Sequence, residues 1–149
     1  MKSKKTTYLL DVNLLISLFD TAHIHHAIAH QWFESKGIRS WSTCPLTENG
    51  LLRILSSPAY PNSPTPIKDL SKRLEEFKTS TQSHSFWNDE YSFSEWLADR
   101  KITIGSSQLT DAYLLQLCHR KEARLATFDR RIQPKLIGEK IQSILEYIS

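Results

Sequence analysis

The sequence predicts an α/β fold whose central sheet is mostly parallel, and three observations support this. Short apolar runs typical of strands alternate with longer amphipathic stretches typical of helices along the 149 residues. Two of the predicted strands end directly at an aspartate, and ligands of parallel sheets gather at these carboxyl ends. The proline-rich segment 56–66 is a loop too short to link two domains. We therefore expect a single domain over residues 1–149.

The N-terminal part begins this alternation. Residues 6–10 form a β-type run that ends at Asp11, and residues 12–19 have the apolar content of a helix that packs on a sheet. A second helix is predicted at 25–35, which has one apolar face. A second strand is predicted at 38–43, where polar and apolar residues alternate.

The middle of the chain is mainly helical. Pro45 stands at the start of a predicted helix over 46–55, a position that suits its fixed backbone angle. Residues 67–78 carry apolar side chains at helical spacing with charges between them. A short strand is predicted at 83–87 and a small helix at 92–97.

The last third returns to strands and helices in turn. Residues 101–107 have the pattern of a short β-type piece with a glycine turn, and residues 109–120 that of a strong helix. Residues 123–128 resemble a buried strand, which ends at Asp129. Residues 141–148 supply a last strand or a short helix.

Composition and charge are ordinary for a soluble globular protein, and the cysteines and the N-terminus predict a cytoplasmic one. Hydrophobic residues make up 40% and charged residues 23%, which excludes a disordered or fibrous chain. The net charge of +3 permits a nucleic-acid partner without requiring one. Cys44 and Cys118 stand far apart, outside any zinc or disulfide spacing, which fits a reducing cytoplasm. Asp11 and Asn13 interrupt the apolar N-terminal run, so we expect neither a signal peptide nor a membrane span.

Four acidic residues stand at predicted strand ends and helix starts. Asp11 and Asp129 each follow a strand, whereas Glu48 and Asp111 each lie in the first turn of a helix. If these ends meet at one edge of the sheet, the carboxylates form a site for a hard divalent cation such as Mg²⁺. Two such ions activate water and stabilise the leaving oxygen of a phosphodiester. Taken singly, Glu48 and Asp111 are explained equally well by the helix macrodipole, and Asp129 by a turn cap.

Five stretches, in chain order, carry a family resemblance: YLLDVNLLISLF, LTENGLLRILSSPAYP, FWND, LTDAYLLQLCHRKEARLATFDRRI and LEYI. Together they resemble the PIN-domain family, specifically the VapC-type toxins of bacterial toxin–antitoxin systems. The resemblance implies a compact α/β/α sandwich and RNA cleavage that depends on Mg²⁺ or Mn²⁺. It also implies a VapB-type antitoxin as partner and, because family toxins are commonly dimeric, a homodimer.

The resemblance further implies roles for single residues. The acidic quartet of catalysis and metal binding falls on Asp11, Glu48, Asp111 and Asp129, with Glu48 either a ligand or the group that orients the attacking water. Asn13 and Thr127 match smaller polar positions that hydrogen-bond and orient the carboxylates. Arg53 matches a recurrent arginine, which contacts phosphate, pairs with an acid or is a plain surface residue. Arg130 and Arg131, beside Asp129, are candidates to hold RNA phosphates.

Other functions fit the sequence to different degrees. A receiver-like signalling domain needs paired acids early in the chain and a lysine at a late strand end, where Asp129 stands. A haloacid-dehalogenase-type phosphatase needs a second aspartate at the position of Asn13. The alternative that stays open is a PIN-like module that binds RNA or protein without catalysis. Such a module is expected to lack one of the four acids, and this sequence has them all.

A histidine cluster, formed by His23, His25, His26 and His30, has no role assigned by these arguments. His26 and His30 have the i, i+4 spacing of helical metal ligands, but the glutamate of an HExxH motif is missing between them. We therefore favour a structural role for the cluster over zinc binding.

Overall fold

The computed structural model describes residues 5–88 and 91–149. Within these residues the centre is a five-stranded sheet of order β3-β2-β1-β4-β5, in which every neighbouring pair is parallel. Its strands are β1 (Tyr8–Leu10), β2 (Trp41–Thr43), β3 (His84–Phe86), β4 (Arg124–Thr127) and β5 (Leu145–Tyr147). The predicted parallel sheet is confirmed. Asp89, which ends the FWND stretch, lies outside the described residues.

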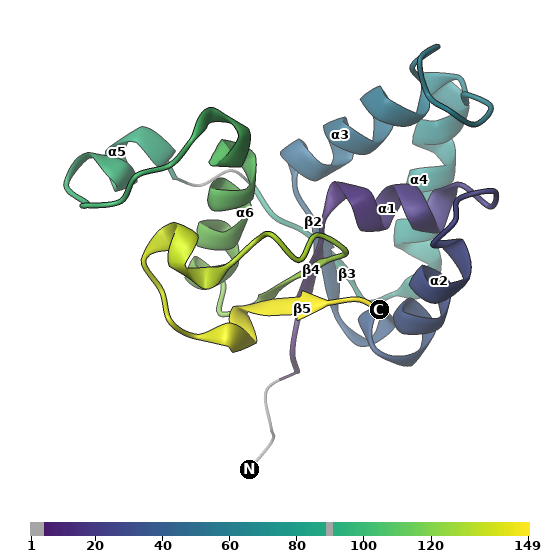
Figure 1. Ribbon diagram of the computed structural model, residues 1–149. Coiled ribbons are helices and arrows are strands. Elements are labelled where there is room, and N and C mark those ends of the chain that lie inside the picture. The colour runs from purple at the N-terminus through teal and green to yellow at the C-terminus, as the bar shows by residue number, and fades with distance from the viewer. Residues whose placement is uncertain (1–4, 89–90) are drawn as a thin grey trace.

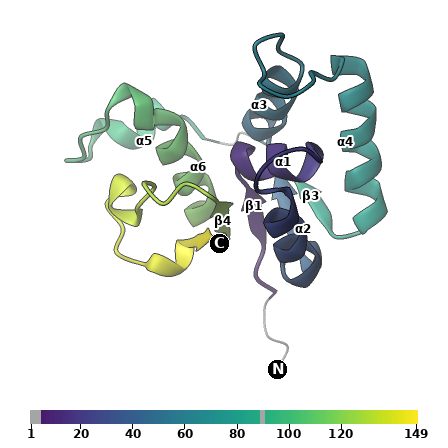
Figure 2. The ribbon, with the colours of Figure 1, turned by 45° about the vertical axis from the view of Figure 1, so that its right-hand side comes forward.

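Helices cover both faces of this sheet (Figure 1, Figure 2). One side carries α1 (Val12–Phe19), α2 (His26–Ser35), α3 (Pro45–Leu55) and α4 (Ile67–Thr81). The other side carries α5 (Phe93–Ala98) and α6 (Leu109–Arg120). Short 3₁₀ turns span Gly37–Arg39, Ser106–Gln108, Pro134–Ile137 and Gln142–Ile144. The three layers are the α/β/α sandwich that the family resemblance implies. No helix in the described part of the chain has the length and apolar character needed to cross a membrane.

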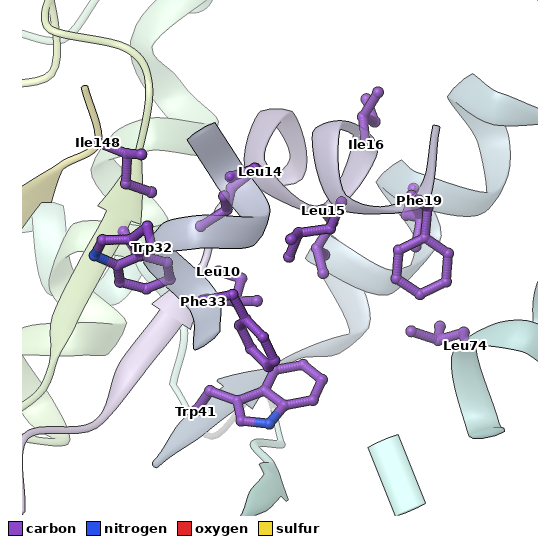
Figure 3. Packing of buried hydrophobic residues seen from close by; sticks show 14 of the residues in the cluster. Leu10, Leu14, Leu15, Ile16, Phe19, Trp32, Phe33, Trp41, Leu74 and Ile148 are labelled. Carbon is purple, nitrogen blue, oxygen red and sulfur yellow. The ribbon is translucent and has the colours of Figure 1, made fainter. Parts of the chain in front are cut away.

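Alternate residues of β1 pack into two separate apolar cores, as the period of a strand requires. Leu9 is fully buried in the core on the α6 side, whereas Leu10 is fully buried among α1, α2 and their neighbours. Figure 3 shows the second of these cores, where the ring of Phe33 meets Trp41 edge to face at a centroid distance of 5.4 Å. Since each buried side chain of this size contributes ~1.5–3 kcal/mol, both helical layers are fixed firmly to β1.

Gly50 allows α1 and α3 to approach closely. A Cβ atom at position 50 would stand 2.7 Å from Cγ2 of Val12, closer than such atoms ever pack. Val12 is the first residue of α1, and Gly50 lies two residues beyond Glu48 in α3. This contact therefore sets the spacing between the starts of two helices that carry predicted site residues.

Two predicted strands differ from the observed structure. Residues 101–105 have no regular structure and lead into the 3₁₀ turn Ser106–Gln108, so the predicted β-type piece at 101–107 is wrong. Ile104 is half-buried against the core on the α6 side, so the alternation there reflects packing without a strand partner. The strand predicted at 38–43 is shorter, because residues 37–39 form a 3₁₀ turn before β2.

The strand order reverses direction at β1, which has β2 on one side and β4 on the other. Such a switch point opens a crevice at the carboxyl ends of the strands, where α/β proteins hold their ligands. Asp11 directly follows β1, and Asp129 follows β4 after Phe128. The topology thus brings these two carboxylates to one edge of the sheet.

Candidate active site

Asp11 is buried at the first turn of α1, with only 6% of its surface exposed. Its Oδ1 accepts a hydrogen bond from the backbone N–H of Val12 at 2.8 Å. Its Oδ2 accepts from the hydroxyl of Thr127 at 2.7 Å and from the amide of Asn13 at 3.3 Å. Because an unpaired buried carboxylate is costly, these donors are what keep the side chain in place.

Thr127, the last residue of β4, connects Asp11 with Asp129. Its hydroxyl donates to Asp11 and accepts the backbone N–H of Asp129 at 3.0 Å and the amide of Asn13 at 3.1 Å. The carbonyl oxygen of the Asn13 side chain accepts the N–H of Phe128 at 3.2 Å. The structure therefore brings the two predicted orienting residues into direct contact with the segments that carry the aspartates.

The three aspartates of the predicted quartet influence one another electrostatically. Burial is the main cause that raises the pKa of Asp11, and the negative charge of Asp129 adds to it. Asp111 is half-buried in the first turn of α6, and its pKa is raised to about 6, first by burial and then by the charges of Asp11 and Asp129. Crowded carboxylates resist ionisation in this way unless a cation balances them.

Arg131 balances part of this charge from the rim of the site. Its Nε lies 3.0 Å from Oδ1 of Asp129 and its Nη2 lies 3.0 Å from Oδ2, and these bonds are the main cause that lowers the pKa of Asp129. The arginine side chain is 91% exposed, so water and salt weaken the pair. Beside it is a cavity of about 230 Å³, whose lining includes Asp111, Asp129 and Arg131.

Glu48 is held by a different set of neighbours. Its Oε2 accepts from the hydroxyl of Thr43 at 2.6 Å and from the ammonium of Lys78 at 3.1 Å. The hydroxyl of Thr43 also lies 2.7 Å from Nε2 of His84. Burial is the main cause that lowers the pKa of His84. These three neighbours of the glutamate were not identified from the sequence. Lys78, for example, has the pattern of any charged residue on an amphipathic helix.

The remaining predicted contact residues lie at the surface. Arg130 is exposed and its guanidinium lies 5.3 Å from the centre of the Tyr147 ring. Arg53 is exposed in the last turn of α3, beside Tyr60. Of these two arginines, Arg130 directly follows Asp129 in the chain, whereas Arg53 is at the end of α3 opposite to Glu48.

The histidine cluster packs along α1 and reaches the segment after β4. The ring of His25 stacks on Phe128 at a centroid distance of 4.9 Å. Nδ1 of His26 donates to the carbonyl oxygen of Ser17 at 2.8 Å, since a carbonyl only accepts. His25 and His26 therefore have packing and hydrogen-bonding contacts of their own, and a structural role for the cluster stays a prediction.

A hard divalent cation fits the donor set of the aspartates. Asp11, Asp111 and Asp129 offer only oxygen ligands, and neighbouring carboxylates add to burial in raising the pKa of Asp11 and Asp111. Within residues 5–88 and 91–149, no three His, Cys, Asp or Glu side chains are close enough to enclose an ion. Mg²⁺ does not need such an enclosure, because it usually keeps several of its waters.

Comparison with known proteins identifies the family. The model of the PIN domain matches residues 8–135. The chain belongs to the PIN-domain family. This PIN domain is 39% identical to Ribonuclease VapC38 of Mycobacterium tuberculosis over 121 residues, which cover 81% of this chain and 84% of the relative. It is 38% identical to Ribonuclease VapC44 of the same organism over 128 residues, which cover 83% and 87% of the two chains.

A solved structure shows the same fold as this PIN domain. The crystal structure of Mycobacterium tuberculosis VapC20, described as a sarcin-ricin loop cleaving toxin, superposes with a TM-score of 0.57. The match covers 81% of this chain and 87% of VapC20 at 13% identity. The architecture is therefore shared although the two sequences have diverged widely.

Proposed function

We propose that this PIN domain is a metal-dependent endoribonuclease that acts as the toxin of a toxin–antitoxin pair. The observation that carries the proposal is the crowding of Asp11, Asp111 and Asp129 where β1, β4 and α6 meet. Relatives named VapC ribonucleases, 38–39% identical over more than four-fifths of the chain, support the reaction class. The proposed cofactor is Mg²⁺ or Mn²⁺, and the proposed unit is a single domain over residues 1–149.

The proposed roles follow from the contacts of each side chain. When bound, the cation polarises the phosphate and the water that attacks it. Asp11, Asp111 and Asp129 hold this charge, while Thr127 and Asn13 fix the carboxylate of Asp11 in one orientation. Limiting the motion of a ligand in this way lowers the cost of assembling the site.

In this proposal, positive charge at the rim of the site binds the phosphates of the RNA. Arg130 and Arg131 are exposed next to Asp129, where guanidinium groups attract the phosphates that flank the reacting bond. When RNA and cation bind, Arg131 exchanges its bonds with Asp129 for bonds with phosphate. Arg53, at the far end of α3, contacts a more distant part of the RNA in this proposal.

The proposed partners are RNA and a VapB-type antitoxin, and the proposed assembly is a homodimer in the cytoplasm. The relatives named VapC support the antitoxin. The buried thiols of Cys44 and Cys118 support a reducing compartment. Chromatography with light scattering on the purified chain measures the assembly directly, and a monomeric mass at micromolar concentration contradicts the dimer.

The deciding experiment is cleavage of total cellular RNA by the purified protein with Mg²⁺, with Mn²⁺ and with EDTA. The matched control is Asp11→Asn, which keeps the shape of the side chain and removes its charge. We expect discrete products with either metal, none with EDTA and none from the variant. A folded protein that cleaves nothing under any of these conditions contradicts the proposal and favours a non-catalytic binding module.

A further inference from the structure

The carboxylate of Glu48 is fixed by neighbours from two other elements. The hydroxyl of Thr43, at the end of β2, donates to Oε2 at 2.6 Å. The ammonium of Lys78, in α4, donates to the same oxygen at 3.1 Å. Glu48 and Lys78 are separated by 30 residues in the chain, and their side chains are only 17% and 13% exposed. Such a pair forms only when α3 and α4 are docked together.

A half-buried imidazole completes this arrangement. A hydroxyl has one hydrogen, and Thr43 uses it toward Glu48. Nε2 of His84, 2.7 Å from the same hydroxyl, must therefore be the donor in that contact. The resulting chain of hydrogen bonds runs from His84 through Thr43 to Oε2 of Glu48, the same oxygen that Lys78 contacts.

Stability alone does not explain this pair. The attraction within a largely buried ion pair is offset by the loss of hydration, and apolar residues of similar volume often stabilise as well. Lys78 also contacts Glu75, a surface residue one turn earlier in α4, so the ammonium would have a partner without Glu48. The arrangement thus costs desolvation at Glu48, and its clear result is one defined position for that carboxylate.

The position of Glu48 is distinct from that of the aspartates. Asp11, Asp111 and Asp129 act on one another's charge, and Arg131 is the cation near them. Glu48 has its own cation in Lys78, on the β2 and β3 side of the sheet. Because β1 and β2 are parallel neighbours, α1 and α3 nevertheless begin at the same edge of the sheet, and the contact of Gly50 with Val12 holds the two helices close.

We propose that Lys78 is a positioning residue of the nuclease site, which holds Glu48 as a fixed carboxylate outside the cation's direct ligands. Lys78 acts through Glu48 and does not itself touch the RNA. In this arrangement the ammonium of Lys78 and the hydroxyl of Thr43 both donate to Oε2 of Glu48. The other oxygen of that carboxylate is left for the attacking water. The inference rests on the proposed ribonuclease function and assigns Glu48 to water orientation in place of metal binding.

The test compares Lys78→Met, Lys78→Arg and Glu48→Gln with the wild-type protein. Initial rates over a range of total RNA concentrations separate kcat from KM, and melting temperatures with and without millimolar Mn²⁺ report cation binding independently of cleavage. Lys72→Met is the matched control, because Lys72 is an exposed lysine of the same helix. Lys78→Gln, which keeps a polar end group, replaces Lys78→Met if the latter fails to fold.

We expect Lys78→Met and Glu48→Gln each to lower kcat by about 10- to 100-fold, the usual effect of losing an outer partner of a metal site. KM and the rise in melting temperature with Mn²⁺ stay at their wild-type values. Lys78→Arg keeps most of the activity, since a guanidinium restores the charge. The double variant is no slower than Glu48→Gln alone, because both changes remove one function.

Three results overturn the inference. Wild-type kcat in Lys78→Met means that Glu48 needs no positioning. A higher KM at unchanged kcat means that Lys78 contacts the RNA directly. Loss of the Mn²⁺ effect in Glu48→Gln means that Glu48 is itself a ligand. Failure of the ribonuclease proposal is distinguished from all three, because the wild-type protein then cleaves no RNA at all.

Discussion

Asp11 after β1 and Asp111 at the start of α6 carry the same functional group as Glu48 at the start of α3, but in different surroundings. Asp11 and Asp111 have raised pKa values, because burial and neighbouring negative charge disfavour their ionised forms. Glu48 instead has a paired ammonium at 3.1 Å. A cation is therefore favoured beside Asp11 and Asp111, whereas Lys78 already supplies one to Glu48, as Arg131 does to Asp129. The same contrast predicts which substitutions affect metal binding and which affect only the reaction.

The largest effect is expected for Asp11→Asn. Removing this charge should lower the cleavage rate by more than about 100-fold, beyond the effect typical of outer partners, and abolish the rise in melting temperature with Mn²⁺. Glu48→Gln is the matched control, which should keep that rise. Parallel melting curves of the two variants check the contrast, and equal responses to Mn²⁺ would remove the distinction between the two acid groups.

The next effect is expected for Thr127→Val, which keeps the shape of the side chain and removes its hydroxyl. Asp11 then loses a 2.7 Å hydrogen bond and the N–H of Asp129 loses its acceptor. We expect a loss of ~1–3 kcal/mol in the free energy of unfolding and about 10- to 100-fold in cleavage. Thr127→Ser should retain most of both. Urea unfolding and initial rates measure them, and a fully active valine variant would contradict the orienting role.

Asp111 gives the aspartate side a pH dependence. The folded protein holds the proton of Asp111 up to about pH 6, whereas the unfolded chain releases it near the ordinary value of 3.8. Without metal, this group therefore lowers the free energy of unfolding as pH rises between these values, with no further change above them. Cleavage should decline as pH falls through about 6, because a protonated Asp111 holds a cation poorly.

Asp111→Asn checks this sign. At neutral pH without metal the variant should melt higher, by ~2–4 °C, which corresponds to roughly 1 kcal/mol after allowance for the half-exposed side chain. The difference in melting temperature should vanish as the pH approaches 3.8, the pKa of the carboxyl in the unfolded chain. A variant that melts lower than the wild type at neutral pH would show that the charge of Asp111 is balanced within the protein.

The smallest effect is expected at the rim, for Arg130→Ala. Its guanidinium lies over Tyr147 and neither acid group depends on it. RNA binding, measured in the Asp11→Asn background to prevent cleavage, should weaken a few-fold and lose about 0.7 in the slope of log affinity against log salt per phosphate contact. Lys72→Ala should leave the slope unchanged. An unchanged slope in Arg130→Ala would exclude it from the RNA surface.

The parallel sheet and the aspartate side of the site were predictable from local sequence. Asp11 and Asp129 directly follow apolar runs, and parallel strands bring such ends to one edge by geometry alone. The partner of Glu48 was not predictable, because Lys78 reaches it only through the docking of α4 on α3. A strand was wrongly predicted at residues 101–107. Alternating polar and apolar residues indicate which side chains are buried but not whether a neighbouring strand is present.

The contact between Gly50 and Val12 makes the spacing between α1 and α3 sensitive to the residue at position 50. Asp11 caps the start of α1, and Glu48 lies in the first turn of α3. A side chain added at position 50 would therefore clash between the two helices that carry these acids. A methyl group there fits only if Val12 or one of the two helices shifts, because its carbon would stand 2.7 Å from Cγ2 of Val12. A substitution at position 50 would therefore change the spacing of the two helices without replacing any acid or changing the charge of the site.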